Sequence, residues 1–206
     1  MKASLERKLF SNYTKQHISS TAWNLKNHLA YKEPENGLLK GIYFNSSSFS
    51  ASQFEPIAFI QPLFVPSDHV YFSFSLGLNA TVKRQWWDYS EETVEESGRV
   101  LADEINEIEK RFFSKINASA DFYRYYLKDK KVTVRYFEAV AYSCAYANLE
   151  GAEKELSDLI DYIKKKENIT IEWVKEIYDN TLLLLDGNAS YLFDMWEKRT
   201  REALKV

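Results

Sequence analysis

The stretch VEESGRVLADEINEIEKRF, residues 94–112, decides the fold of this chain of 206 residues. Its apolar or small residues recur at intervals of three and four, at Val94, Gly98, Leu101, Ile105, Ile108 and Phe112. Because an α-helix has 3.6 residues per turn, these positions share one stripe, and the spacing predicts a long amphipathic helix. Its acidic residues then lie on the outer face.

The chain before this helix follows a period of two, which is typical of strands with one buried face. In residues 70–78, for example, apolar side chains alternate with small or polar ones. All four prolines lie between residues 34 and 66, and Pro-Glu-Asn-Gly at 34–37 predicts a turn. Four strands are expected, over residues 23–31, 38–45, 57–65 and 70–78.

The chain after the long helix returns to a helical period, with no proline. Further helices are expected over residues 119–127, 134–149, 152–166, 171–186 and 190–205. The predicted fold class is therefore α+β, with an N-terminal antiparallel sheet of about four strands followed by a helical C-terminal region of five to six helices. The sheet region would span residues 1–87 and the helical region 88–206, unless the two form one continuous domain.

The composition excludes several classes of protein. With 45% hydrophobic and 28% charged residues, the chain is too apolar for intrinsic disorder. No apolar stretch is long enough for a membrane span, and the charged first ten residues lack the apolar core of a signal peptide. The single cysteine, Cys144, cannot form an intramolecular disulfide and is expected to be buried. We therefore expect a cytoplasmic protein with no membrane segment.

No cofactor, metal or catalytic set is expected from the motifs. The three histidines, His17, His28 and His69, have neither helical nor strand spacing for a shared metal ion. The six glycines form no phosphate-binding loop. Asp68 and His69 are adjacent, and an aspartate can orient an imidazole for base catalysis, but an aspartate that caps a turn is the plainer interpretation.

Charge is strongly segregated although the net charge is only −3. Residues 88–109 hold nine acidic residues and one arginine, a net charge of −8, and residues 110–135 hold eight basic and two acidic residues, a net charge of +6. The two blocks could pair with each other or be solvated. Alternatively, the acidic block is a docking surface that steers a basic partner. The overall acidic balance disfavours nucleic acid as that partner, although the basic block at 110–135 keeps this option open.

Trp86 and Trp87 lie side by side just before the acidic helix. One tryptophan could anchor the sheet to the helical part while the other is exposed as a hot spot for a partner. Trp23, Trp173 and Trp196 are expected in the core. The predicted partner-binding residues are thus Trp86, Trp87, Glu92, Glu95, Glu96, Asp103 and Glu107.

The layout resembles uncharacterised bacterial α+β proteins found among toxin-immunity and defence genes. The resemblance covers the phrase FIQPL at residues 59–63, the run FSFSLGL at 72–78 and the helices that follow. It includes no diagnostic motif and carries over no functional residue. It implies a cytoplasmic protein whose role is to bind another protein.

Three functional hypotheses follow. The first is a non-catalytic protein-binding protein, most concretely an immunity-type inhibitor or accessory subunit of a bacterial toxin or defence system, which docks a basic partner through its acidic helix. The second is a hydrolase that uses Asp68 and His69 with a serine from residues 46–50. The third is a structural subunit or homo-oligomer.

Overall fold

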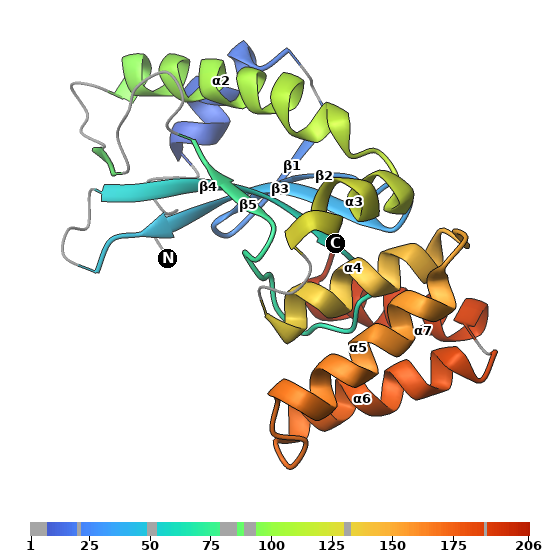
Figure 1. Ribbon diagram of the computed structural model, residues 1–206. Helices are drawn as coiled ribbons and strands as arrows, with labels where there is room; N and C mark the ends of the chain where they lie inside the picture. Colours follow the sequence, from blue (N-terminus) through green and yellow to red (C-terminus); the bar gives the residue numbers. More distant parts are fainter. Residues whose placement is uncertain are drawn as a thin grey trace. The chain divides into compact units, whose positions relative to one another are not determined.

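The computed structural model confirms the predicted α+β class, because an antiparallel sheet is followed by helices (Figure 1). The structure describes residues 8–19, 22–48, 53–78, 86–88, 94–129, 133–187 and 189–206. The strands are β1 (Trp23–Lys26), β2 (Leu29–Lys32), β3 (Leu38–Ser46), β4 (Gln53–Pro62), β5 (Ser75–Gly77) and β6 (Trp87–Asp88). The helices are α2 (Val94–Arg111), α3 (Ser119–Tyr126), α4 (Val134–Tyr146), α5 (Ala152–Lys166), α6 (Glu172–Leu185) and α7 (Ala189–Leu204), with short π- or 3₁₀-helical turns η1 (Phe10–Thr14), η2 (Lys15–His17), η3 (Phe113–Lys115) and η4 (Leu127–Asp129). None of the described helices is long and apolar enough to cross a membrane.

The strands of the described sheet run in the order β1-β2-β3-β4-β5, and β6 also pairs with β4. The predicted turn at 34–37 is confirmed, since Glu35 and Leu38 form a bridge around Asn36 and Gly37, which both have positive φ. The predicted strand over 23–31 is wrong, because the chain reverses at Asn27, whose φ of 50° allows a tight turn between β1 and β2.

The predicted strand over 70–78 is also mostly wrong. Only Ser75–Gly77 is a strand, and its residues pair with β4 from Ile57 to Phe59. Phe74 and Leu78 are buried, but Phe72 and Leu76 of the same alternating set are exposed. The alternating pattern of apolar residues at 70–78 therefore did not establish that the backbone pairs with a neighbouring strand.

The chain divides into two compact units. Unit 1 consists of Met1–Pro34, Leu39–Gln61 and Phe74–Lys115, and unit 2 of Glu35–Leu38, Pro62–Ser73 and Ile116–Val206. Unit 1 thus contains most of the sheet together with α2, and unit 2 contains α3 to α7 together with the loop that follows β4.

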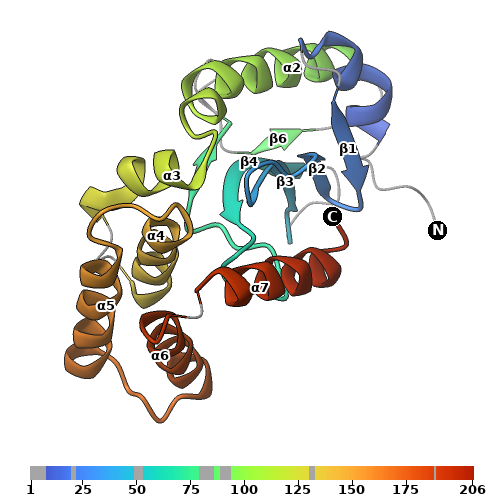
Figure 2. The same cartoon turned by 90° about the vertical axis from the view of Figure 1, so that its right-hand side faces the viewer.

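In unit 1, α2 lies over one side of the sheet (Figures 1 and 2). Its predicted apolar stripe is confirmed, since Gly98, Leu101, Ile105 and Ile108 are all buried. Aromatic rings continue the core beneath it. Phe10 contacts both Trp23 and Phe44 edge-on at centroid distances of 6.1 and 5.9 Å.

In unit 2, α4 packs against α5 and α7, and α6 also packs against both of them (Figure 2). The Tyr142 ring stacks on Trp196 at 5.7 Å, and its hydroxyl lies 3.1 Å from the hydroxyl of Thr181. Cys144 is buried, as predicted, and so are Trp23 and Trp196. Trp173 is 40% exposed, so its prediction as a core residue is wrong. It stands in the first turn of α6, where Val174 is the residue that turns inward.

Candidate functional site

The adjacent tryptophans of unit 1 have opposite environments. Trp87 is fully buried in β6 and stacks on Phe54 at 6.5 Å, whereas Trp86 is 39% exposed. Neighbouring residues of an extended chain point to opposite sides, which explains the difference. Trp87 therefore anchors this segment and offers no surface to a partner, while the ring of Trp86 faces solvent.

Of the acidic docking residues, Glu95, Glu96 and Asp103 are exposed on α2, and Glu107 is half-buried. At 100° per residue these four side chains lie within an arc of about 120°. We call them the acidic face. The remaining predicted acid, Glu92, lies outside the described residues.

Part of the negative charge of the acidic block is neutralised by basic side chains or is buried. Lys110 donates to Glu107 at 2.8 Å, and this hydrogen bond and its charge hold the pKa of Glu107 below its usual value. Glu104 is buried, and Glu109 forms an ion pair with Lys32 at 2.5 Å. The exposed negative charge is therefore smaller than the sequence block indicated.

Unit 2 contains a cavity of about 450 Å³ lined by the loop after β4 and by helices α4, α6 and α7. Titratable or charged side chains reach it from every one of these elements, namely Asp68 and His69, Arg135 and Glu138, Glu176, and Arg199. The indole of Trp173 also lines it. This convergence of charge around a cavity is typical of binding and catalytic sites.

Glu138 is the deepest charged group of this cavity, with its side chain only 1% exposed. Arg135, one helical turn earlier in α4, donates from Nη1 to Glu138 Oε2 at 2.9 Å. Burial raises the pKa of Glu138 to about 7, although Arg135 acts to lower it, and Glu176 adds to the rise. The carboxyl group can thus gain or lose a proton near neutral pH.

The guanidinium of Arg135 also lies over Trp173, 5.2 Å from the centre of its ring. Arg135 therefore joins a buried carboxylate of α4 to an aromatic side chain of α6. Such a cation over an indole is favourable, more so where water is partly excluded.

Asp68 and His69 lie at the rim of the same cavity. His69 Nδ1 is 2.5 Å from Asp68 Oδ1, and this hydrogen bond lowers the pKa of Asp68. Both side chains are highly exposed, at 74% for His69 and 87% for Asp68. The turn itself is held by Ser67, whose hydroxyl donates to the carbonyl of His69 at 2.7 Å.

The serines predicted as nucleophiles belong to a different part of the chain. Ser46 ends β3, and Ser47 and Ser48 follow it in unit 1, whereas Asp68 and His69 belong to unit 2. Ser50 lies outside the described residues. Within those residues, no group of three or more His, Cys, Asp or Glu side chains is arranged to hold a metal ion.

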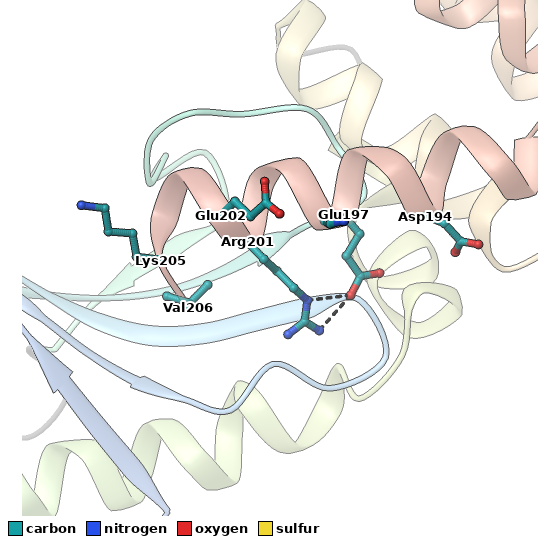
Figure 3. A pocket seen from close by; sticks show the side chains of 7 residues that line it. Asp194, Glu197, Arg201, Glu202, Lys205 and Val206 are labelled. Atoms are coloured by element: carbon teal, nitrogen blue, oxygen red, sulfur yellow. Dashed lines mark hydrogen bonds and ion pairs between the residues drawn. The ribbon is translucent and has the colours of Figure 1, made fainter.

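A second recess, of about 660 Å³, is lined by residues of α7 and the chain end that follows it (Figure 3). Glu197 and Arg201 form its ion pair, with Arg201 Nη2 2.8 Å from Glu197 Oε1. Tyr146 of α4 donates to the other oxygen of Glu197 at 3.1 Å. These charges satisfy each other within the fold, so the recess offers less to a ligand than the cavity around Glu138.

Comparison with protein-family models, with curated proteins and with solved structures finds no match to this chain. The roles of the residues above therefore rest on their geometry.

Sequence reasoning did not single out Glu138, Glu176 or Arg199, and it assigned Arg135 only to the basic block. One feature of the sequence could have identified Glu138. Glu138 stands in the run VRYFEAVAYSCAY, a helix that is otherwise almost entirely apolar or small beyond its first turn. A carboxylate in such a helix is buried, and Arg135 three residues earlier is its natural partner.

Proposed function

We propose that this is a non-catalytic protein-binding protein that docks a basic partner through Trp86 and the acidic face of α2. Its most concrete form is an immunity-type inhibitor or accessory subunit of a bacterial toxin or defence system, acting by occlusion. The observation that carries the proposal is the pair of tryptophans. The buried Trp87 holds the backbone in place, so the exposed ring of Trp86 is presented with little loss of entropy on binding.

The acidic face supports the same proposal through long-range electrostatic attraction. Exposed carboxylates attract a basic partner over distances comparable to the Debye length, about 8 Å at physiological salt. They raise the association rate and disfavour acidic partners. An aromatic anchor and an acidic face in one unit thus supply affinity and selectivity respectively.

The test begins with recovery of the partner from the native cell extract at low and at high salt. Affinity is then compared between the wild type and the triple variant Glu95→Lys, Glu96→Lys, Asp103→Lys. We expect the variant to bind at least tenfold more weakly, with a flatter dependence on salt. Trp86→Ala should cost about 2 kcal/mol or more, roughly 30-fold in affinity.

A matched control separates the acidic face from overall charge. Glu150, Glu153 and Asp161 are exposed acids of unit 2, and changing all three to Lys alters the net charge by the same amount. This control should bind like the wild type. Equal affinity and salt dependence in both triple variants would contradict docking through α2.

Hydrolysis at Asp68 and His69 is a second candidate function, favoured by the position of the pair at the rim of the cavity. If His69 acts as the base, His69→Ala should lower the rate of hydrolysis of a p-nitrophenyl ester by roughly 100-fold. His17→Ala, at an exposed histidine of η2, is the control. Full activity in His69→Ala would remove this candidate.

A further inference from the structure

The carboxylate of Glu138 lines the cavity of unit 2 and is almost fully buried. An ionised carboxylate accepts hydrogen bonds on both oxygens. Arg135 donates to Oε2 of Glu138, and Glu138 lines the cavity with its side chain only 1% exposed. A carboxylate so nearly excluded from water is costly to ionise, and a cation that enters the cavity reduces this cost.

The charges around the cavity favour a ligand that carries one positive charge. Three acids, Asp68, Glu138 and Glu176, face two arginines, Arg135 and Arg199. When all three carboxyl groups are ionised, these acids exceed the arginines by one negative charge. A single cation balances this set, whereas an anion would add to the excess and approach Glu138 unfavourably.

The apolar part of the cavity fits a ligand with an alkyl chain. Trp173 is 40% exposed and presents part of its indole at the cavity, and Val65 and Pro66 line it from the loop after β4. An alkyl chain can pack on these groups while its charged end reaches the carboxylates, as lysine side chains do on protein surfaces.

We propose that this cavity binds the primary ammonium group of a ligand, with Glu138 and Glu176 as acceptors and Trp173 covering the alkyl chain. The group could belong to a free alkylamine or to a lysine side chain of a peptide, and the recognition chemistry is the same. The proposal is independent of docking through α2, because it involves unit 2 alone.

Binding is coupled to protons. An ammonium group favours the ionised form of Glu138, so the complex loses affinity as the pH falls through the pKa of about 7. The groups that face Glu138 are Arg135 and Tyr142 from α4, Tyr71 from the loop after β4 and Glu176 from α6, with Asp68, His69 and Arg199 around the same cavity. Between pH 8 and pH 6 we expect an affinity loss of about tenfold.

The experiment titrates the full chain with n-butylammonium chloride and with Nα-acetyl-lysine amide, following the indole NMR signal of Trp173 at pH 8 and pH 6. The neutral analogues n-butanol and Nα-acetylnorleucine amide are the ligand controls. We expect saturable shifts with the two cations, at dissociation constants of about 1 mM or below, and none with the neutral compounds. Tighter binding of the lysine amide points to a peptide source, and tighter binding of butylammonium to a free amine.

Two variants test the assigned acceptors. Glu138→Gln should weaken binding at least tenfold at pH 8 and remove most of the pH dependence. Glu176→Gln, at an exposed side chain that leaves the core intact, should weaken binding severalfold and keep the pH dependence. Glu172→Gln, at an exposed glutamate of the same helix that does not line the cavity, should have no effect. Equal shifts with cationic and neutral probes, no saturation at roughly 20 mM, or unchanged affinity in Glu138→Gln and Glu176→Gln would overturn the proposal.

Discussion

Glu138 shows how one buried residue couples the stability of the protein to pH. Its pKa of about 7 lies above the ordinary value of 4.5, because burial penalises the ionised form more than Arg135 compensates. Between these two pH values the folded protein retains a proton that the unfolded chain releases. The resulting stabilisation is fully present below pH 4.5 and is lost as the pH rises through 7.

Glu138→Gln should therefore flatten the pH dependence of stability. Relative to the variant, the wild type should lose up to about 1.4 kcal/mol of unfolding free energy per pH unit between pH 5 and pH 7. Urea unfolding at pH 5, 6, 7 and 8 measures both slopes. Identical slopes in the two proteins would show that Glu138 titrates as it does in water.

Among the elements, the helices could be predicted well and the strands only in part. Helix α5 has the predicted bounds, and α3, α6 and α7 begin and end within one residue of prediction, because a spacing of 3.6 is sustained over several turns and marked by breakers such as Gly151 and Gly187. Strands depend on partners distant in the sequence. The chain at 23–31 therefore looked like one strand although it is a hairpin, and the run at 70–78 pairs only briefly.

Gly98 of α2 lies directly against Tyr13 of η1. A Cβ atom at this position would lie 2.4 Å from Cβ of Tyr13 and 2.9 Å from its backbone carbonyl carbon, so backbone would have to move. Gly98→Ala should destabilise unit 1 by about 1–3 kcal/mol despite the better helix propensity of alanine. Arg99→Ala, at the exposed next residue, is the control. Chemical unfolding with equal midpoints for both variants would contradict this packing.

At the scale of the whole molecule, each unit is assembled from segments far apart in the chain. Unit 2 includes Pro62–Ser73, which precede its first helix by more than forty residues. Phe64 of this loop stacks on Tyr146 of α4 at 4.0 Å and meets Phe193 of α7 edge-on at 5.8 Å. The loop is therefore part of the core of the helical unit, and it also carries Asp68 and His69 to the cavity.

Phe64→Ala should consequently destabilise the helical unit although the residue follows a strand. Removal of a fully buried phenylalanine costs about 3–5 kcal/mol. The loss can be measured by hydrogen exchange of the amides of α4 and α7. Phe72→Ala, at an exposed phenylalanine of the same loop, is the control. Unchanged protection in Phe64→Ala would show that the loop contributes nothing to this core.

The sequence alone determined the α+β class, the helices and the outward position of Glu95, Glu96 and Asp103. These features follow from the spacing of apolar residues, which depends only on residues close together in the chain. Only the tertiary structure decided which tryptophan is exposed, how the segments are distributed between the two units, and which charges meet. Asp68, Glu138, Glu176 and Arg199 come from four segments, and nothing in their spacing marks them as neighbours. They line one cavity because the apolar faces of the loop and helices pack together, and the raised pKa of Glu138 is a consequence of that packing.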